Sequence, residues 1–349
     1  MKNHGKIIAA AGISLLLLCT GCGASAKNEN INAGMEAIEA LDYDGALVKF
    51  DDAVMAGESK RLLYRGQGLA YMGKTMYEEA VGAFEKSLSY SNGFIEAIDI
   101  DINYYLAVAY YKQGDIVKTL DSYDAIIAYD SSQADAYYLR GAVKAERNQL
   151  EEAQEDFARA MKLQPDNYDR LIDIYCVLEK NGYKDYGQEQ LRAVIETDAK
   201  SMKNDVIGRM YYYLGDYDNA RIYLEKAREG GTMQAILFLG KTYEALGDNN
   251  YAISVYNAFI EEDQTSARIY NQLGICKISM GEYEEALEAF QTGMKIEGND
   301  LLQVLKMNEI VAYEYLGEYK KAAVLLDSYL KTYPDDETAA REYDFLKTR

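Results

Sequence analysis

One short pattern of residues recurs along almost the whole chain at a spacing close to 34 residues. Nine copies start near Lys27, Arg61, Ile100, Ala134, Tyr168, Ser201, Met233, Ala267 and Gln303, at intervals between 32 and 39 residues. A unit of this length cannot bury an apolar core by itself, so neighbouring copies must stack on one another. The spacing therefore predicts an array of repeated units that share a continuous core.

Within most copies, two positions twelve residues apart hold small side chains, and a bulky apolar residue follows four positions after the second. The first small position is occupied by Gly34, Gly68, Ala107, Gly141, Gly208, Gly240 and Gly274, the second by Ala46, Ala80, Ala153, Ala220, Ala252 and Ala286, and the bulky position by Phe50, Phe84, Tyr123, Phe157, Leu224, Tyr256 and Phe290. Small side chains that face one another let two helices approach at the near end of the usual ~8–10 Å separation. Each copy is therefore predicted to be a closely packed helix pair.

The segments between the two halves of a copy are typical of a helix end followed by a helix start. They contain Gly114, Gly215, Gly247 and Gly281, followed in three cases by Asp115, Asp216 and Asp248. Glycine suits the left-handed backbone position that ends a helix, and aspartate suits the N-cap of the next helix. We therefore expect a tight turn inside each pair.

The pattern resembles the tetratricopeptide repeat, whose signature reads W-x-x-L-G-x-x-Y, A-x-x-x-F and P. The clearest copy combines Leu273-Gly274 with Tyr283, Ala286 and Phe290, although the chain has no tryptophan. The resemblance covers residues 27–336. It implies an all-α fold, a right-handed superhelical α-solenoid of about nine helix-turn-helix repeats over residues 30–336, with residues 337–349 as a short C-terminal capping helix.

Two places depart from the regular pattern. The copy that begins at Tyr168 has Tyr175 and Gly187 at its two small positions, which predicts a loosened or bent pair. Five additional residues around Ser91–Asp99 predict a lengthened loop or helix start between the second and third copies.

The first 21 residues differ in kind from the rest of the chain. Lys2 and Lys6 precede a 12-residue apolar run, Ile7–Leu18, as in a bacterial secretory signal. The run is short for a bilayer span. Gly21-Cys22 then resembles the end of a lipoprotein signal, in which a small residue precedes the cysteine that carries lipid. The alternative is an ordinary cleaved signal with an incidental cysteine.

The lipoprotein resemblance implies a cellular location as well as an order of domains. Residues 1–21 are expected to be a signal peptide, and residues 22–29 a lipidated cysteine with a short tether. The lipid on Cys22 would hold the protein at the extracytoplasmic face of a bacterial cell membrane, on a Gram-positive surface or on the periplasmic face in a Gram-negative cell.

The charge of the chain limits its partners. The formal net charge is −20, and it becomes −22 without residues 1–21, which carry two lysines and no acid. Nucleic-acid phosphates would repel such a chain, and an anionic membrane surface would repel it as well. We therefore expect no nucleic-acid partner.

Histidine, which many catalytic and metal sites use, is scarce. The only histidine is His4, inside the predicted signal peptide, so the remaining chain has no imidazole for a Ser-His-Asp or Cys-His arrangement or for metal ligation. Asp99-x-Asp101-x-Asn103 begins like a calcium loop, but Tyr104 and Tyr110 stand where that loop needs Gly and Glu. We expect no enzyme activity, no cofactor and no bound metal.

In proteins with this repeat, side chains of the first helices line the groove that binds partners. The resemblance carries this role to Arg65, Leu69, Tyr104, Tyr105, Tyr111, Lys112, Tyr138, Arg209, Tyr212, Tyr213, Phe238 and Lys241. Tyrosine offers a large contact area at a low entropic cost, which suits recognition. The same tyrosines could instead pack between repeats.

Two functions fit these expectations. The first is a membrane-anchored scaffold whose groove binds a peptide or protein partner in envelope assembly, secretion or complex formation. The second is a glycan-handling lipoprotein of exopolysaccharide export, in which tyrosines stack on sugars. The absence of tryptophan favours the first. A clamp for a C-terminal carboxylate, which some members of the family build from Lys and Asn, is not present in the copies where Arg65/Leu69 and Tyr104/Val108 occupy those positions.

Overall fold

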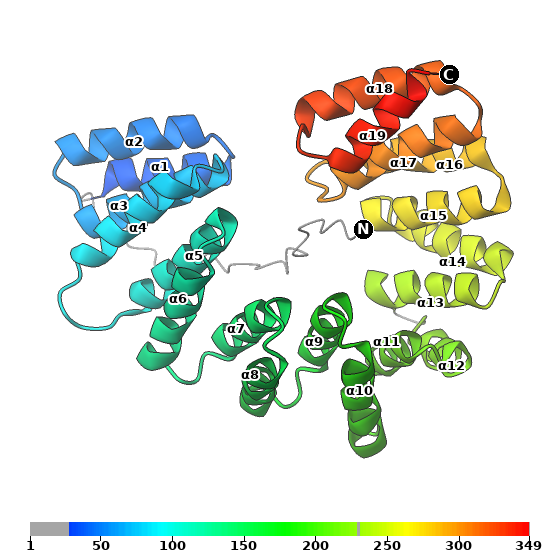
Figure 1. The fold of residues 1–349 in the computed structure, drawn as a ribbon, viewed down its shortest axis with the longest axis horizontal. Coiled ribbons are helices and arrows are strands. Elements are labelled where there is room, and N and C mark those ends of the chain that lie inside the picture. Colours follow the sequence, from blue (N-terminus) through cyan, green and yellow to red (C-terminus); the bar gives the residue numbers. More distant parts are fainter. Residues whose placement is uncertain (1–27, 229–230, 349) are drawn as a thin grey trace. The chain divides into compact units, whose positions relative to one another are not determined.

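The computed structural model describes residues 28–228 and 231–348, and within these ranges it contains nineteen helices and no strand. The helices fall into two compact units that divide between Gln164 and Pro165. Figure 1 shows the helices in their order along the chain. The predicted all-α architecture of helix-turn-helix repeats is confirmed. Residues 1–27, which include the predicted signal peptide and Cys22, lie outside the described residues.

Unit 1 consists of four helix pairs. Their bounds are α1 (Glu29–Glu39), α2 (Tyr43–Met55), α3 (Lys60–Gly73), α4 (Tyr77–Ser89), α5 (Ala97–Gln113), α6 (Ile116–Tyr129), α7 (Ala134–Glu146) and α8 (Leu150–Leu163).

Unit 2 consists of five helix pairs and a last single helix. Their bounds are α9 (Tyr168–Lys180), α10 (Lys184–Asp198), α11 (Asn204–Leu214), α12 (Tyr217–Arg228), α13 (Met233–Ala245), α14 (Asn249–Glu262), α15 (Ala267–Met280), α16 (Tyr283–Met294), α17 (Leu302–Tyr315), α18 (Tyr319–Thr332) and α19 (Glu337–Leu346).

Each unit is built as two layers of helices. An odd-numbered helix packs against the even-numbered helix that follows it, and the even-numbered helix packs against the next odd-numbered one. Odd-numbered helices also contact one another, as α1 contacts α3 in unit 1 and α11 contacts α13 in unit 2. One layer is therefore made of the first helices of the repeats and the other of the second helices.

The close approach within a pair depends on glycine facing a large ring. A methyl group added to Gly240 would lie 2.2 Å from the ring of Tyr256, which has no exposed surface. The same addition at Gly274 would lie 2.4 Å from the ring of Phe290. Carbon atoms need about 3.5 Å or more, so only glycine lets these helices reach their observed positions. The sequence predicts that the two small residues of a pair face each other, whereas in these pairs the ring of the bulky residue faces the glycine.

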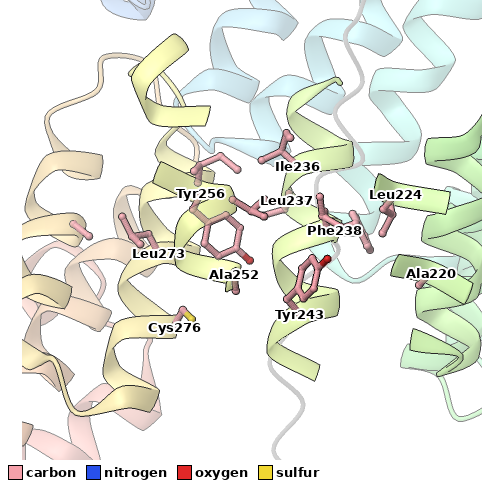
Figure 2. Close-up of a cluster of buried hydrophobic side chains, with 14 residues drawn as sticks. Ala220, Leu224, Ile236, Leu237, Phe238, Tyr243, Ala252, Tyr256, Leu273 and Cys276 are labelled. Carbon is pink, nitrogen blue, oxygen red and sulfur yellow. The ribbon is translucent and has the colours of Figure 1, made fainter. Parts of the chain in front are cut away.

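The largest described core cluster lies in unit 2 and connects three successive repeats. It contains Leu224, Phe238, Tyr256 and Cys276, which come from α12, α13, α14 and α15. Figure 2 shows that these side chains project from neighbouring helices into shared interior space. No single pair supplies enough apolar surface for a core, so stacking is what stabilises the array.

The turns within the pairs have the chemistry expected from the sequence. Gly114 and Gly215 adopt left-handed backbone angles, with φ of 81° and 77°. The carboxylate of Asp115 accepts a hydrogen bond from the Lys118 backbone nitrogen at 3.1 Å, which caps α6. This bond satisfies one of the free N–H groups at the start of a helix.

The irregular copy in unit 2 exchanges the sizes of the residues at its two contact positions. Tyr175, on α9, is 1% exposed, and a methyl group on Gly187 of α10 would lie 3.0 Å from its ring. The large residue therefore comes from the first helix and the small one from the second. The hydroxyl of Tyr175 donates to Glu179 at 2.8 Å and to the Tyr213 carbonyl at 3.2 Å, which connects α9 with α11.

The additional residues in unit 1 form the predicted longer loop, between α4 and α5. Its most exposed apolar residues are Phe94 and Ile95. At the other end of the chain, the predicted capping helix is α19, whose Ala339 and Leu346 are buried against the last pair. The Tyr343 hydroxyl donates to Asp327 of α18 at 2.8 Å and fixes this helix in place.

Candidate functional site

The structure places all twelve predicted groove residues on odd-numbered helices. Arg65 and Leu69 lie on α3, Tyr104, Tyr105, Tyr111 and Lys112 on α5, Tyr138 on α7, Arg209, Tyr212 and Tyr213 on α11, and Phe238 and Lys241 on α13. Eight of the twelve are half-buried, Lys112 is exposed, and the other three are buried. Whether they contact a partner stays a prediction.

In unit 1, three of the predicted residues make contacts within the chain. Arg65 forms an ion pair with Asp101 at 2.5 Å, and its guanidinium lies 5.9 Å from the ring centre of Tyr105. The Tyr105 ring stacks on Phe84 at 5.5 Å. The Tyr111 hydroxyl donates to Glu146 at 2.6 Å. These contacts tie α5 to its neighbours, so this part of the predicted face serves packing between repeats.

Three predicted groove residues have little surface to offer a partner. Tyr138 is 7% exposed, and Arg209 and Phe238 are each 5% exposed. Arg209 is surrounded by carboxylates, because it pairs with Asp169 at 2.5 Å and approaches Asp205 at 3.7 Å. The position in the repeat correctly gives the helix of each residue. It does not show that neighbouring side chains cover all three.

In unit 2, four of the predicted residues come together around one pocket of about 450 Å³. These residues are Tyr212 and Tyr213 of α11 and Phe238 and Lys241 of α13. The other lining residues are Tyr175, Glu179, Lys184, Gln188, Leu214, Gly215 and Tyr217. The pocket thus lies where the irregular pair α9–α10 meets the regular repeats that follow it.

Aromatic rings form one wall of this pocket. The ring of Phe238 meets those of Tyr212 and Tyr213 edge-on, at centroid distances of 5.2 and 5.5 Å. Tyr213 also lies 5.0 Å from Tyr175, and Tyr212 lies 5.6 Å from Tyr217. Such edge-to-face contacts hold rings in fixed positions. The rings of the wall are therefore packed against one another without a partner.

Hydrogen bonds fix the polar side of the same pocket. Gln188 donates to the Tyr213 carbonyl at 3.0 Å, and this carbonyl also receives the hydroxyl of Tyr175. The ammonium of Lys184 lies 3.1 Å from Glu179, so the positive charge of Lys184 has a partner in the chain. Two hydroxyls that line the pocket, those of Tyr212 and Tyr217, make no hydrogen bond with any residue the structure describes.

Lys241 is the distinctive charge of the site. Its side chain is partly buried, its ammonium lies 5.6 Å from the ring centre of Phe238, and it forms no ion pair within residues 28–228 and 231–348. Burial lowers the pKa of this ammonium, and Glu244 only partly opposes the effect. The Glu244 carboxylate is committed elsewhere, because it accepts from Tyr256 at 2.6 Å and from Gln272 at 3.0 Å. A partner group that carries an oxygen atom would give the Lys241 ammonium a hydrogen-bond acceptor.

The sequence did not reveal Tyr175, Lys184, Gln188 and Tyr217 as pocket residues. Lys184 and Gln188 lie on a second helix, Tyr217 begins another, and Tyr175 occupies a position that normally holds glycine. The one available signal was the irregularity of the copy that begins at Tyr168.

Neither a metal centre nor a membrane span was located in the part of the chain that the structure describes. No group of three or more His, Cys, Asp or Glu side chains there is arranged to hold a metal ion. No helix among residues 28–228 and 231–348 is long and apolar enough to cross a bilayer.

Family models for the tetratricopeptide repeat match the chain at four places. One model matches residues 134–167, 205–227 and 267–300, and a second matches residues 310–336. The matches coincide with α7–α8, α11–α12, α15–α16 and α17–α18.

Several known proteins are similar to the chain over part of their length. DnaJ homolog subfamily C member 3 of Gallus gallus is 28% identical over 64% of this chain and 50% of its own length. Superkiller complex protein 3 of Homo sapiens is 23% identical over 85% of this chain and 19% of its own length. The chain therefore spans half or less of these relatives. A tetratricopeptide repeat protein from Parabacteroides merdae aligns with 81% of this chain and 97% of its own at 17% identity and a TM-score of 0.47.

Proposed function

Because this chain is a tetratricopeptide-repeat protein, we propose that it is a membrane-anchored scaffold that holds a peptide or protein segment in the pocket between α9 and α13. Repeats of this kind form scaffolds suited to protein–protein interaction and are generally non-enzymatic. We propose that this pocket is the binding site and that the lipid on Cys22 is the anchor. The setting is envelope assembly, secretion or complex formation at the outer face of a cell membrane.

The observation that carries the pocket assignment is the combination of a packed aromatic wall with an ammonium that lacks an ion pair. Rings held in place by edge-on contacts lose little freedom when a partner packs on them. Lys241 and the hydroxyl of Tyr212 can donate hydrogen bonds to carbonyl or carboxylate oxygens of a partner chain. Both features lie in the same pocket of about 450 Å³, which has room for a few side chains of a bound segment.

The anchor rests on the sequence. A charged start, an apolar run and Gly21-Cys22 together resemble a lipoprotein signal. An anchor with two or more acyl chains holds a protein durably, because each buried methylene contributes ~0.8 kcal/mol. In this proposal the protein binds neither nucleic acid nor metal.

Photo-crosslinking in cells tests the pocket. A photoreactive phenylalanine analogue would replace Tyr212, and a matched control would carry it at Tyr315, which is 56% exposed on α17. We expect position 212 to capture a discrete protein that position 315 does not. Capture of polysaccharide at position 212 would support the glycan-handling alternative, whose tyrosines stack on sugars. Equal capture at both positions would contradict a specific site in the pocket.

Lipid labelling tests the anchor separately. We expect the protein to incorporate a labelled fatty acid and the Cys22→Ala variant to incorporate none. Labelling that survives this substitution would contradict the assignment of Cys22.

A further inference from the structure

One edge of unit 1 exposes a group of apolar side chains. Its most exposed members are Met55, Phe94 and Ile95, with 90%, 76% and 58% of their surface accessible. Tyr90, Tyr129 and Leu62 are each 38–40% exposed. We call these six residues the apolar edge. Large apolar side chains gathered in this way on a soluble surface mark contact sites.

The architecture of the repeats explains why these residues share an edge. Met55 and Tyr129 end the second helices α2 and α6, and Tyr90 directly follows α4. Leu62 lies in the first turn of α3. Phe94 and Ile95 lie in the loop that leads from α4 to α5. Figure 1 shows the turn between α2 and α3 and the loop between α4 and α5 on the same side of unit 1.

Side-chain contacts connect the segments of this edge. The Tyr90 ring stacks on Tyr64 at 5.7 Å, and the ammonium of Lys60 lies 5.4 Å from the Tyr90 ring centre. Arg61 pairs with Glu96 across the loop. The end of α4 and the start of α3 are thus neighbours, as the two-layer arrangement requires.

The edge carries few charges of its own. Segments 55–62, 90–96 and 129–133 together contain two cations and three carboxylates, a net charge of −1. The Glu58 carboxylate, one of the three, is occupied by hydrogen bonds from the backbone of Asn30 and Ile31, both at 3.0 Å. A zwitterionic lipid surface has no net charge, so these few charges do not oppose its approach to the edge.

The tether that would carry the lipid leaves the described structure at the same edge. Asn28 accepts a hydrogen bond from the Ser59 backbone nitrogen at 3.2 Å, in the turn that follows Met55. Only five residues lie between Cys22 and Asn28, and the six Cα–Cα steps from Cys22 to Asn28 span at most about 22 Å. A lipid on Cys22 would therefore bring this edge, before any other part of unit 1, close to the membrane.

We propose that the apolar edge rests on the bilayer surface, with Met55, Phe94 and Ile95 at the boundary between headgroups and acyl chains. This inference relies on the proposed lipid anchor and adds a defined orientation of unit 1 on the membrane. Apolar side chains at such a boundary lie about 5–10 Å deep, and tyrosine rings favour the same level. The lipid surface that fits is one of zwitterionic headgroups, because the acidic remainder of the chain is repelled by anionic ones.

Tryptophan fluorescence tests this orientation, because the chain has no tryptophan of its own. The full chain, produced with its own first 21 residues and reconstituted in phosphatidylcholine vesicles, would carry either Phe94→Trp or Val117→Trp. Val117 is a matched control, since it is 70% exposed and lies at the start of α6, at the opposite end of its pair. Vesicles that contain lipid brominated in its acyl chains report contact with the membrane interior by quenching.

We expect the tryptophan at position 94 to shift to shorter wavelength and to be quenched, and the tryptophan at position 117 to show neither change. Equal emission at both positions, with the protein still floating with the vesicles, would overturn the orientation and leave the anchor intact. If the protein does not float and Cys22→Ala has no further effect, the anchor itself fails. If a photoreactive residue at position 94 crosslinks to another protein, and the tryptophan at position 94 is not quenched, the inference is also overturned.

Discussion

The close contact between α3 and α4 allows a sharp test of how glycine holds a repeat together. Gly68 lies on α3, and a methyl group there would lie 2.4, 2.6 and 2.7 Å from three carbon atoms of the Phe84 ring. Phe84 has no exposed surface and stacks on Tyr105, so its ring has no free space into which to move. Gly82 lies on α4 in the same pair, is exposed, and has no atom within 4 Å of the added methyl group.

The two substitutions to alanine share one effect and differ in another. Alanine is favoured over glycine inside a helix by about 0.5–1 kcal/mol, so both variants gain this amount. Only Gly68→Ala also overpacks the core, which costs about 1–3 kcal/mol. We therefore expect Gly82→Ala to raise the free energy of unfolding by about 0.5–1 kcal/mol and Gly68→Ala to lower it by about 0.5–2 kcal/mol.

Urea unfolding followed by far-ultraviolet circular dichroism measures both changes, provided that the slope of the transition is unchanged. A double-mutant cycle with Phe84→Leu identifies the cause, because a shorter side chain leaves room for the methyl group. In that background Gly68→Ala should cost at least 1 kcal/mol less than in the wild type. If Gly68→Ala is as stable as Gly82→Ala, close helix approach through Gly68 is not what sets the packing of this pair.

Three further predictions concern charge. Burial and the neighbouring Glu342 raise the pKa of Glu314 to about 7. The folded state therefore binds this proton more tightly than the unfolded state, and stability falls as pH rises from about 4.5 to 7. Urea unfolding at pH 5 and pH 8 should show a loss on the order of 1–2 kcal/mol, after allowance for partial exposure, and Glu314→Gln should abolish this loss. Asp156 is 3% exposed and pairs with two cations. Asp156→Ala should therefore lower the free energy of unfolding by about 2–4 kcal/mol in the same assay. A loss below about 0.5 kcal/mol would show that these ion pairs do not stabilise the fold. Lys241→Met should weaken binding of the crosslinked partner about tenfold in titration calorimetry. The same change at the exposed Lys320 is the control and should not alter the affinity. Equal affinities of the Lys241→Met and Lys320→Met variants would show that Lys241 is not part of the site.

Much of the fold could be predicted because the repeated residues act locally. Spacing alone places Gly274 and Phe290 in one helix pair, although it does not show that the ring of Phe290, and not Ala286, faces the glycine. The left-handed turn at Gly114 and the cap at Asp115 are equally local. Nine copies repeat the same information, which makes the helix pairs visible without any knowledge of long-range contacts.

The pocket could be predicted only in part because it depends on how different repeats meet. Tyr212 and Lys241 occupy positions that face the groove in related proteins, and both line the pocket. Phe238 follows the same rule but is covered by the rings of Tyr212 and Tyr213, and no spacing shows this. Tyr175 and Gln188 come from the irregular copy, where the rule assigns them no role.

The exchanged pair Tyr175 and Gly187 limits how a chain of this kind can change length. Repeats that share the usual order of small and large residues can be duplicated or lost, since any copy presents its neighbour with the same contact surface. The pair α9–α10 is not interchangeable in this way, because a copy with glycine at position 175 would remove both the ring and the hydroxyl bonds that reach Glu179 and Tyr213. Gain or loss of repeats outside α9–α14 would alter the length of the array and leave the pocket, whereas replacement of the pair α9–α10 would leave the length and remove the pocket.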